Sequence, residues 1–204
     1  MSETCNFFAA ISRMKYIERW ALMRNSRQEN LSEHAMEVAM IAHALCVIGN
    51  TRYGKTLNAD RAAVIGLFHD ASEIITGDMP TPVKYYSPTI RDAYKSVEAI
   101  AEEQLLDKLP DDLRPTYESV FKGTDDENEQ YMRRLVKAAD KISAWIKCME
   151  EEKSGNTEFA TAKQSISAML EEMRAAYPEV GDFLDECIPP YGRTLDELQN
   201  DKTK

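Results

Sequence analysis

The sequence of 204 residues is poor in the residue types that interrupt helices or cross-link chains. It contains only eight glycines, eight prolines and four cysteines. The cysteines are widely separated and none belongs to a CxxC pair, so neither a disulfide framework nor a thiolate zinc site is indicated. We therefore expect four reduced thiols.

Basic side chains are also in deficit. Lys and Arg number 25 against 35 Asp and Glu, which gives a formal net charge of −10. This balance disfavours broad contact with a polymeric nucleic acid, although a small basic pocket for one phosphate is compatible with it. The amino terminus lacks the basic segment and apolar core of a secretory signal, and no later stretch approaches a membrane span. We expect a cytoplasmic protein without a membrane partner.

Strand patterns are the third absence. Alternating β-branched runs bounded by turns are hard to find, whereas Ala, Leu, Met and Glu recur at helical spacing. Hydrophobic residues make up 43% of the chain, enough for a sizeable core at this length. The sequence predicts an all-α helical bundle in one domain over residues 1–204, with a core of about 6–155 and a helical tail of about 156–204.

Helix-start and helix-stop signals give the expected order of elements. Asn30 begins a capping signal, and Asn58 or Asp60 caps the central helix. Two prolines exclude regular helix from residues 77–84. The expected helices cover residues 6–18, 31–50, 60–76, 87–109, 129–152, 159–177 and 179–188, with a short helix after Pro110.

Three side chains of the kind that bind metals interrupt the apolar central helix. They are His69, Asp70 and Glu73, and a bound cation is the simplest way to keep a buried carboxylate ionised there. On a continuous helix His69 and Glu73 share one face. A His-Asp dipeptide is common by chance, so a hydrogen-bonded core histidine is the alternative interpretation.

Two further helices add candidate ligands. His34 continues the apolar stripe of the helix that follows Asn30, and Asp140 lies among apolar residues of the helix at 129–152. A structural histidine and a carboxylate paired with lysine are the alternatives, although the nearby lysines lie on other faces and would pair only at the edge. Because three interior helices each contribute a candidate, we expect one common site.

The combined set contains two imidazoles and two carboxylates. Such a set suits a divalent first-row metal such as Mn²⁺, Co²⁺ or Zn²⁺ and is a poor oxygen cage for Ca²⁺. An ion of this kind lowers the pKa of bound water and polarises a phosphoryl group. Hydrolysis of a phosphate ester is therefore the reaction that the ligands favour.

The order His, His-Asp and distant Asp resembles the HD-domain metal-dependent phosphohydrolases. The surrounding residues resemble more closely the bacterial 5′-deoxynucleotidases of the YfbR-like group. The matching stretches are residues 12–13, 19–25, 29–34, 69–73, 76–85 and 137–140.

This resemblance implies a homodimeric enzyme that hydrolyses deoxyribonucleoside 5′-monophosphates to deoxynucleoside and phosphate, with little preference for the base. It implies a metal held by His34, His69, Asp70 and Asp140. Glu73 would orient or deprotonate the attacking water.

The resemblance also implies substrate contacts. Arg19 would hold the phosphate and assist catalysis, Trp20 would lie against the sugar, and Asp78 would accept a hydrogen bond from the 3′-hydroxyl. The remaining expected substrate contacts are His34, Met79, Pro80 and Thr81.

Two alternatives remain open. Another HD hydrolase, acting on a dNTP, a cyclic nucleotide or ppGpp, would keep the same metal ligands. A non-catalytic helical scaffold would bind no metal and show no turnover.

Overall fold

The computed structural model describes residues 4–84 and 86–200, without the side chains of Thr81 and Asn200. Over these residues it contains helices and no strands, apart from an isolated bridge between Glu18 and Asn30. The prediction of an all-α fold is confirmed. The α-helices are α1 (Phe7–Ile11), α2 (Leu31–Tyr53), α3 (Ala59–Phe68), α4 (Glu73–Thr76), α5 (Thr81–Lys84), α6 (Pro88–Leu106), α7 (Arg114–Lys122), α8 (Glu127–Lys153), α9 (Ala160–Ala176), α10 (Pro178–Glu186) and α11 (Leu195–Asn200), and two 3₁₀ helices are η1 (Ser12–Tyr16) and η2 (Thr157–Phe159).

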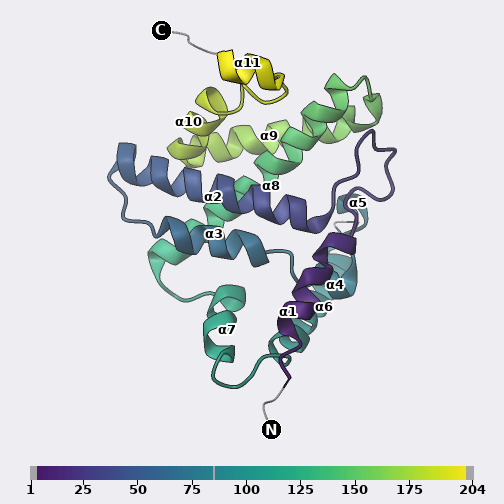
Figure 1. Ribbon diagram of the computed structural model, residues 1–204, viewed down its shortest axis with the longest axis vertical. Coiled ribbons are helices and arrows are strands. Elements are labelled where there is room, and N and C mark those ends of the chain that lie inside the picture. Colours follow the sequence, from purple (N-terminus) through teal and green to yellow (C-terminus); the bar gives the residue numbers. More distant parts are fainter. Residues whose placement is uncertain (1–3, 85, 201–204) are drawn as a thin grey trace.

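The centre of the molecule is formed by α2, α3 and α8, with α9 and α10 packed on one side (Figure 1). Helices α1, α4, α6 and α7 gather at the other end of the molecule. Each end has its own apolar cluster. Buried residues of α2, α3, α8, η2, α9 and α10 form the larger one, and Phe7, Leu105 and Leu106 are fully buried in the smaller.

The long helix α2 begins and ends through specific local contacts. The Asn30 side chain accepts from two backbone N–H groups of the first turn, and Glu33 returns a bond to the Asn30 N–H, so the predicted capping box is confirmed. The prediction that the helix ends at Gly49–Asn50 is wrong. It continues to Tyr53 and ends at Gly54, whose φ of 64° supplies the left-handed conformation of a helix stop.

The apolar character of α2 reaches that of a membrane span. By length and composition, with a mean hydropathy of 1.4, this helix could cross a membrane, so the expectation that no stretch approaches a span was wrong. Core helices pass the same test, and Val38, Ile41 and Leu45 of α2 are buried in the main cluster. The absence of a membrane partner stays a prediction.

The predicted first helix is interrupted. α1 ends at Ile11 and a 3₁₀ turn follows, after which Ile17 is extended, so the chain is not helical to residue 18. The Ser12 hydroxyl donates to the Ala9 carbonyl at 2.8 Å, a side-chain bond that competes with the helical pattern. Arg19 and Trp20 consequently lie in a loop and not at the end of a helix.

The predicted central helix is also broken, at His69. α3 ends at Phe68, a turn carries His69 and Asp70, and α4 starts at Glu73. The His69 Nδ1 lies 2.7 Å from the Gly66 carbonyl, which in a continuous helix would accept from the Asp70 N–H. His69 and Glu73 therefore do not share one face of a regular helix.

Two smaller expectations were also wrong. Residues 77–84 contain the four-residue helix α5, because a proline is tolerated in the first turn, where the N–H needs no helical partner. The helix expected to begin at residue 129 is α8, which already begins at Glu127. The Asp126 side chain caps it by accepting from the Glu129 N–H.

The helices of the predicted tail bury side chains against the central helices. Phe159, Leu170, Val180 and Phe183 belong to the same cluster as residues of α2 and α8. The division of residues 1–204 into core and tail stays a prediction. All four cysteines are free thiols, as expected.

Candidate metal centre

Four predicted ligands meet where α2, the turn between α3 and α4, and α8 converge. His34, His69 and Asp70 offer donor atoms that lie within 4.8 Å of one another. The Nε2 of His69 is 2.9 Å from Asp70 Oδ2, and that oxygen is 3.6 Å from the Nε2 of His34. Asp140 joins through His34, whose Nε2 lies 3.2 Å from Asp140 Oδ1.

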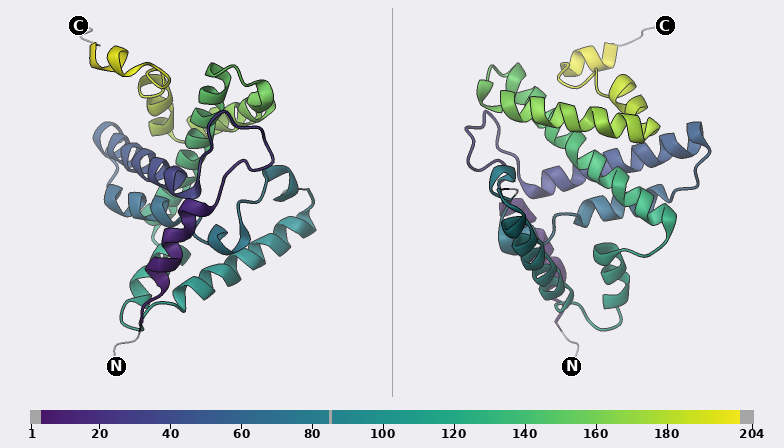
Figure 2. Two further views of the ribbon diagram at one scale, coloured as in Figure 1. Left: turned by 45° about the vertical axis from the view of Figure 1, so that its right-hand side comes forward. Right: turned by 180° about the vertical axis from the view of Figure 1, so that it is seen from behind.

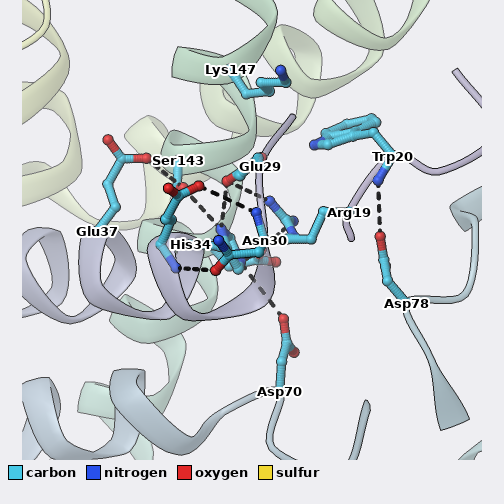
Figure 3. A network of polar contacts seen from close by, with 12 residues as sticks. Arg19, Trp20, Glu29, Asn30, His34, Glu37, Asp70, Asp78, Ser143 and Lys147 are labelled. Atoms are coloured by element: carbon cyan, nitrogen blue, oxygen red, sulfur yellow. Dashed lines mark hydrogen bonds and ion pairs between the residues drawn. The ribbon is translucent and has the colours of Figure 1, made fainter. Parts of the chain in front are cut away.

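The other ring nitrogen of each histidine is held by the protein. His34 Nδ1 lies 3.0 Å from the Ser143 hydroxyl, which donates its own hydrogen to Glu37 at 2.6 Å (Figure 3). The Nδ1 of His34 must therefore carry a hydrogen and donate it to Ser143. His69 Nδ1 donates to the Gly66 carbonyl, which only accepts. In their neutral forms both rings then present a bare Nε2 lone pair, as metal-binding histidines do.

These two lone pairs are buried and have no hydrogen-bond partner. Each instead faces a carboxylate oxygen of Asp70 or Asp140, so acceptor atoms face one another across a few ångströms. Such an arrangement is stable only if a proton or a cation lies between the groups. The residues present therefore fit a divalent metal ion.

The electrostatics of the cluster agree with this fit. Although burial opposes its charge, the carboxylates of Asp70 and Asp140 raise the pKa of His69 to about 9. Burial and the positive charge of Arg19 lower the pKa of His34. Excess negative charge thus accumulates around His69, and a cation would neutralise it.

Glu73 stands at the start of α4, one turn after the His-Asp pair. It is only 7% exposed, and its Oε2 has no hydrogen-bond partner. Burial and the negative charges of Asp70 and Asp78 raise the pKa of Glu73 to about 9. A cation among the neighbouring ligands would oppose this rise and favour the ionised form, which can accept a proton.

The lysines of this helix were expected to pair with Asp140 only at the edge, and one of them makes such a contact. Lys141 folds back so that its Nζ contacts Asp140 Oδ2 at 3.0 Å. The two oxygens of Asp140 have different neighbours, because Oδ2 contacts Lys141 while Oδ1 faces the Nε2 of His34. Lys147, another lysine of α8, pairs with Glu151 instead.

The predicted substrate residues Arg19 and Trp20 lie beside this cluster. Arg19 bonds Glu29 at 3.1 Å and approaches Asp140 Oδ1 at 4.0 Å, with its side chain 10% exposed and its Nε without a partner. Although burial opposes the charge, Glu29 and Asp140 raise the pKa of Arg19. A permanently charged guanidinium is thereby held next to the candidate metal ligands.

Asp78 connects the 77–84 segment to the Arg19–Trp20 pair. Its Oδ2 accepts from the backbone N–H of Trp20 at 3.1 Å, and Figure 3 shows the two residues facing each other. Met79 and Pro80 follow in the same segment and are half-buried. The side chain of Thr81 lies outside the described part of the chain, so its predicted role stays a prediction.

Sequence reasoning assigned no role to three residues that support this site. Glu29 bonds Arg19, while Ser143 and Glu37 fix the ring of His34. Glu37 follows His34 by one turn of α2, and Ser143 follows Asp140 by one turn of α8. A search for polar residues three positions after each ligand would have found both.

Comparison with known proteins agrees with the geometry. The family model for the YfbR-like 5′-deoxynucleotidases matches residues 6–191. A 5′-deoxynucleotidase of Shewanella oneidensis is 47% identical over 193 residues, which cover 95% of this chain and 97% of that protein. The 5′-deoxynucleotidase YfbR of Salmonella paratyphi B is 46% identical over 198 residues, 96% of each chain.

A solved structure shows the same fold. An HD-domain phosphohydrolase from Listeria innocua superposes with a TM-score of 0.78 at 23% identity, covering 91% of this chain and 88% of the other. This similarity identifies the HD fold predicted from the sequence. With the family model matched over nearly the whole chain, the protein belongs to the YfbR-like 5′-deoxynucleotidase family.

Proposed function

We propose that this protein is a metal-dependent 5′-deoxynucleotidase that hydrolyses deoxyribonucleoside 5′-monophosphates to deoxynucleoside and phosphate. The observation that supports it best is the pair of buried, unpartnered Nε2 atoms facing two carboxylates beside Arg19. This combination offers a cation site and a phosphate anchor within one family of phosphomonoester hydrolases.

His34, His69, Asp70 and Asp140 would hold the ion, with Co²⁺, Mn²⁺ or Zn²⁺ as the candidate metals. A divalent ion bound there supplies a nucleophile at neutral pH and stabilises the charge that develops on the phosphoryl oxygens. The protein contributes the fixed orientation of both imidazoles. Ser143 and the Gly66 carbonyl determine that orientation.

Arg19 and Glu73 carry the remaining chemistry. The guanidinium of Arg19 would bind phosphate oxygens through its planar set of donors, and Glu29 holds it in place from the opposite side. Glu73 would accept a proton from the attacking water through its free Oε2. The water oxygen bonds to phosphorus as the bond from phosphorus to O5′ breaks, and Glu73 would pass the proton that it accepted to the departing 5′-oxygen.

Trp20 and Asp78 would contact the sugar of the substrate. The indole of Trp20 packs edge-on against Phe159 with ring centroids 5.3 Å apart, so it forms a fixed wall. Asp78 uses Oδ2 to hold the Trp20 N–H, and its other oxygen would accept from the 3′-hydroxyl. Met79, Pro80 and Thr81 would complete the pocket, with His34 at its border and little selection for the base.

We also propose a cytoplasmic homodimer that uses mononucleotides and no polymeric nucleic acid. Four free thiols support the cytoplasmic location, and the formal net charge of −10 disfavours contact with polymeric nucleic acid. The homodimer is what the family resemblance implies.

The test is an assay of phosphate release after chelation and reloading with Co²⁺, Mn²⁺ or Zn²⁺. The substrate panel contains four deoxynucleoside monophosphates, AMP, dATP and cyclic AMP. We expect metal-dependent release from every deoxynucleoside monophosphate and much less from AMP. Turnover of dATP or cyclic AMP alone would assign the site to another HD hydrolase, and no turnover with any metal would contradict catalysis.

A further inference from the structure

The loop of residues 20–29 has no helix or strand, yet it carries Trp20 into the proposed site. Its ends are joined, because the Arg19 N–H donates to the Glu29 carbonyl at 2.9 Å. Trp20 has a φ of 58°, in the left-handed region that bulky residues rarely adopt. Such a conformation persists only where surrounding contacts determine the backbone.

Glu151, near the carboxyl end of α8, supplies such contacts at the tip of the loop. Its Oε2 accepts from the Ser26 N–H at 2.9 Å and from the Ser26 hydroxyl, and its Oε1 accepts from the Arg27 N–H at 3.3 Å. The Asn156 side-chain amide lies 2.7 Å from both Glu151 Oε2 and the Arg24 carbonyl. These contacts fasten the loop to the end of α8, which it approaches in Figure 2.

We call Lys147, Glu151 and Asn156 the loop anchor, and it contains a buried ion pair. Glu151 is 1% exposed and Lys147 is 5% exposed, and the Lys147 ammonium donates to Glu151 and to the Arg27 carbonyl. Although burial opposes ionisation, hydrogen bonds from Lys147, Ser26 and Asn156 lower the pKa of Glu151 well below its ordinary value. The carboxylate is therefore charged at neutral pH, and its bonds to the loop are of the stronger, charge-assisted kind.

We propose that Glu151 is a positioning residue for substrate binding, because it holds the 20–29 loop so that Arg19 and Trp20 face the metal ligands. The anchor also supports the indole, since the centroid of the Phe159 ring lies 5.3 Å from that of Trp20 and 5.5 Å from the Lys147 Nζ. This inference rests on the proposed function, from which Arg19 and Trp20 take their roles. It adds a residue that itself belongs to the loop anchor and not to the metal cluster.

The first test is Glu151→Gln in the full chain, measured by steady-state kinetics with dAMP. The amide keeps one acceptor oxygen but loses the charge and turns donors toward the loop. We expect KM to rise about 10-fold or more, the loss typical of a charge-assisted hydrogen bond, while kcat changes less than about 3-fold. Co²⁺ affinity should stay unchanged. The control is Glu150→Gln, an exposed glutamate on the same helix, which should alter neither constant.

Hydrogen exchange tests the anchor without any assay of activity. In Glu151→Gln the amides of residues 20–29 should exchange faster, while those of α2 and the centre of α8 keep their protection. Unchanged exchange in the loop would overturn the proposal.

A second variant separates positioning from stability. Replacing only one partner leaves a buried unpaired charge, whereas the double variant Lys147→Met with Glu151→Gln removes both charges. We expect its Tm to recover relative to Glu151→Gln while KM stays raised, because Ser26 and Arg27 still lack the carboxylate. Recovery of KM together with Tm would show a purely structural role.

The two proposals fail in different ways. A wild-type protein that turns over no deoxynucleoside monophosphate would contradict the proposed function, and loop exchange would then decide the anchor alone. An active wild-type protein with an unchanged KM in folded Glu151→Gln would overturn the positioning role and leave the proposed function intact.

Discussion

Two groups of buried charged side chains lie at the base and at the tip of the 20–29 loop, and they differ in how their polar atoms are satisfied. At the tip, both oxygens of Glu151 accept hydrogen bonds, and Lys147 has two acceptors. At the base, the Nε2 atoms of His34 and His69 are buried and have no hydrogen-bond partner. Buried polar atoms are thus completely paired in one group and lack partners in the other.

The two groups therefore have different roles: the group at the tip supports the loop, and the group at the base can bind a ligand. A satisfied buried network fixes one conformation, whereas an unsatisfied one is stable only with a ligand that completes it. The loop connects the two groups through Arg19, which bonds Glu29 beside the histidines. If this comparison is correct, variants at the base should remove metal and turnover, and variants at the tip should weaken substrate binding.

The largest effect should come from Asp70→Asn, which removes a ligand charge at the base. We expect metal affinity to fall more than about 100-fold, beyond the loss seen for residues that only orient ligands, and turnover to disappear with it. Elemental analysis and phosphate release measure both quantities. Asp92→Asn, at an exposed carboxylate of α6, is the control. Full metal content with a normal rate in Asp70→Asn would remove Asp70 from the ligand set.

Glu73→Ala should separate proton transfer from metal binding. The variant should keep its metal and lose about 10²–10⁴-fold in kcat, the range for a positioned general base. Elemental analysis measures the metal content of the variant, and steady-state kinetics measures its kcat relative to the wild type. Loss of the metal would instead identify Glu73 as a ligand.

Ser143→Ala tests whether the histidine tautomer matters. Without the hydroxyl, His34 Nδ1 loses its 3.0 Å partner, and we expect metal affinity to fall about 10–100-fold, as for other residues that orient ligands. Calorimetric titration with Co²⁺ measures the change. Ser165→Ala, an exposed serine of α9, is the matched control, and equal affinity in both variants would contradict this role.

The smallest effect concerns the sugar. An indole wall leaves a 2′-hydroxyl without a partner, at a cost of about 1–3 kcal/mol, so Trp20→Ala should narrow the ratio of kcat/KM for dAMP over AMP about 10-fold. Arg19→Ala should lower kcat/KM for dAMP and for AMP by a similar factor, because each substrate carries the phosphate. Four rate constants decide this, and an unchanged ratio in Trp20→Ala would place discrimination in the segment around Asp78.

The sequence predicted those parts of the site that depend on local pattern. The capping box at Asn30 and the apolar stripe through Val38 and Ile41 place His34 correctly, because both signals lie within one helix. The break at His69 was missed. It involves the His69 side chain bonding the Gly66 carbonyl, and a period of apolar residues carries no information about that bond.

Individual side-chain contacts were the other feature that the sequence did not predict. Lys141 was assigned to a different face from its neighbour Asp140, but a long flexible side chain can fold back and make the contact. Glu151 meets the loop across 125 residues of sequence at Ser26, and nothing in the local pattern of α8 marks it as different from its exposed neighbour Glu150.

The most direct test of the central claim is a calorimetric titration of Co²⁺ into the chelator-treated wild-type protein, with dAMP hydrolysis measured at each point. We predict about one ion bound per chain, because one cluster offers two bare imidazole nitrogens beside two carboxylates, and phosphate release that rises in proportion to occupancy. Full hydrolysis in the metal-free protein, or no binding of Co²⁺, would contradict the claim.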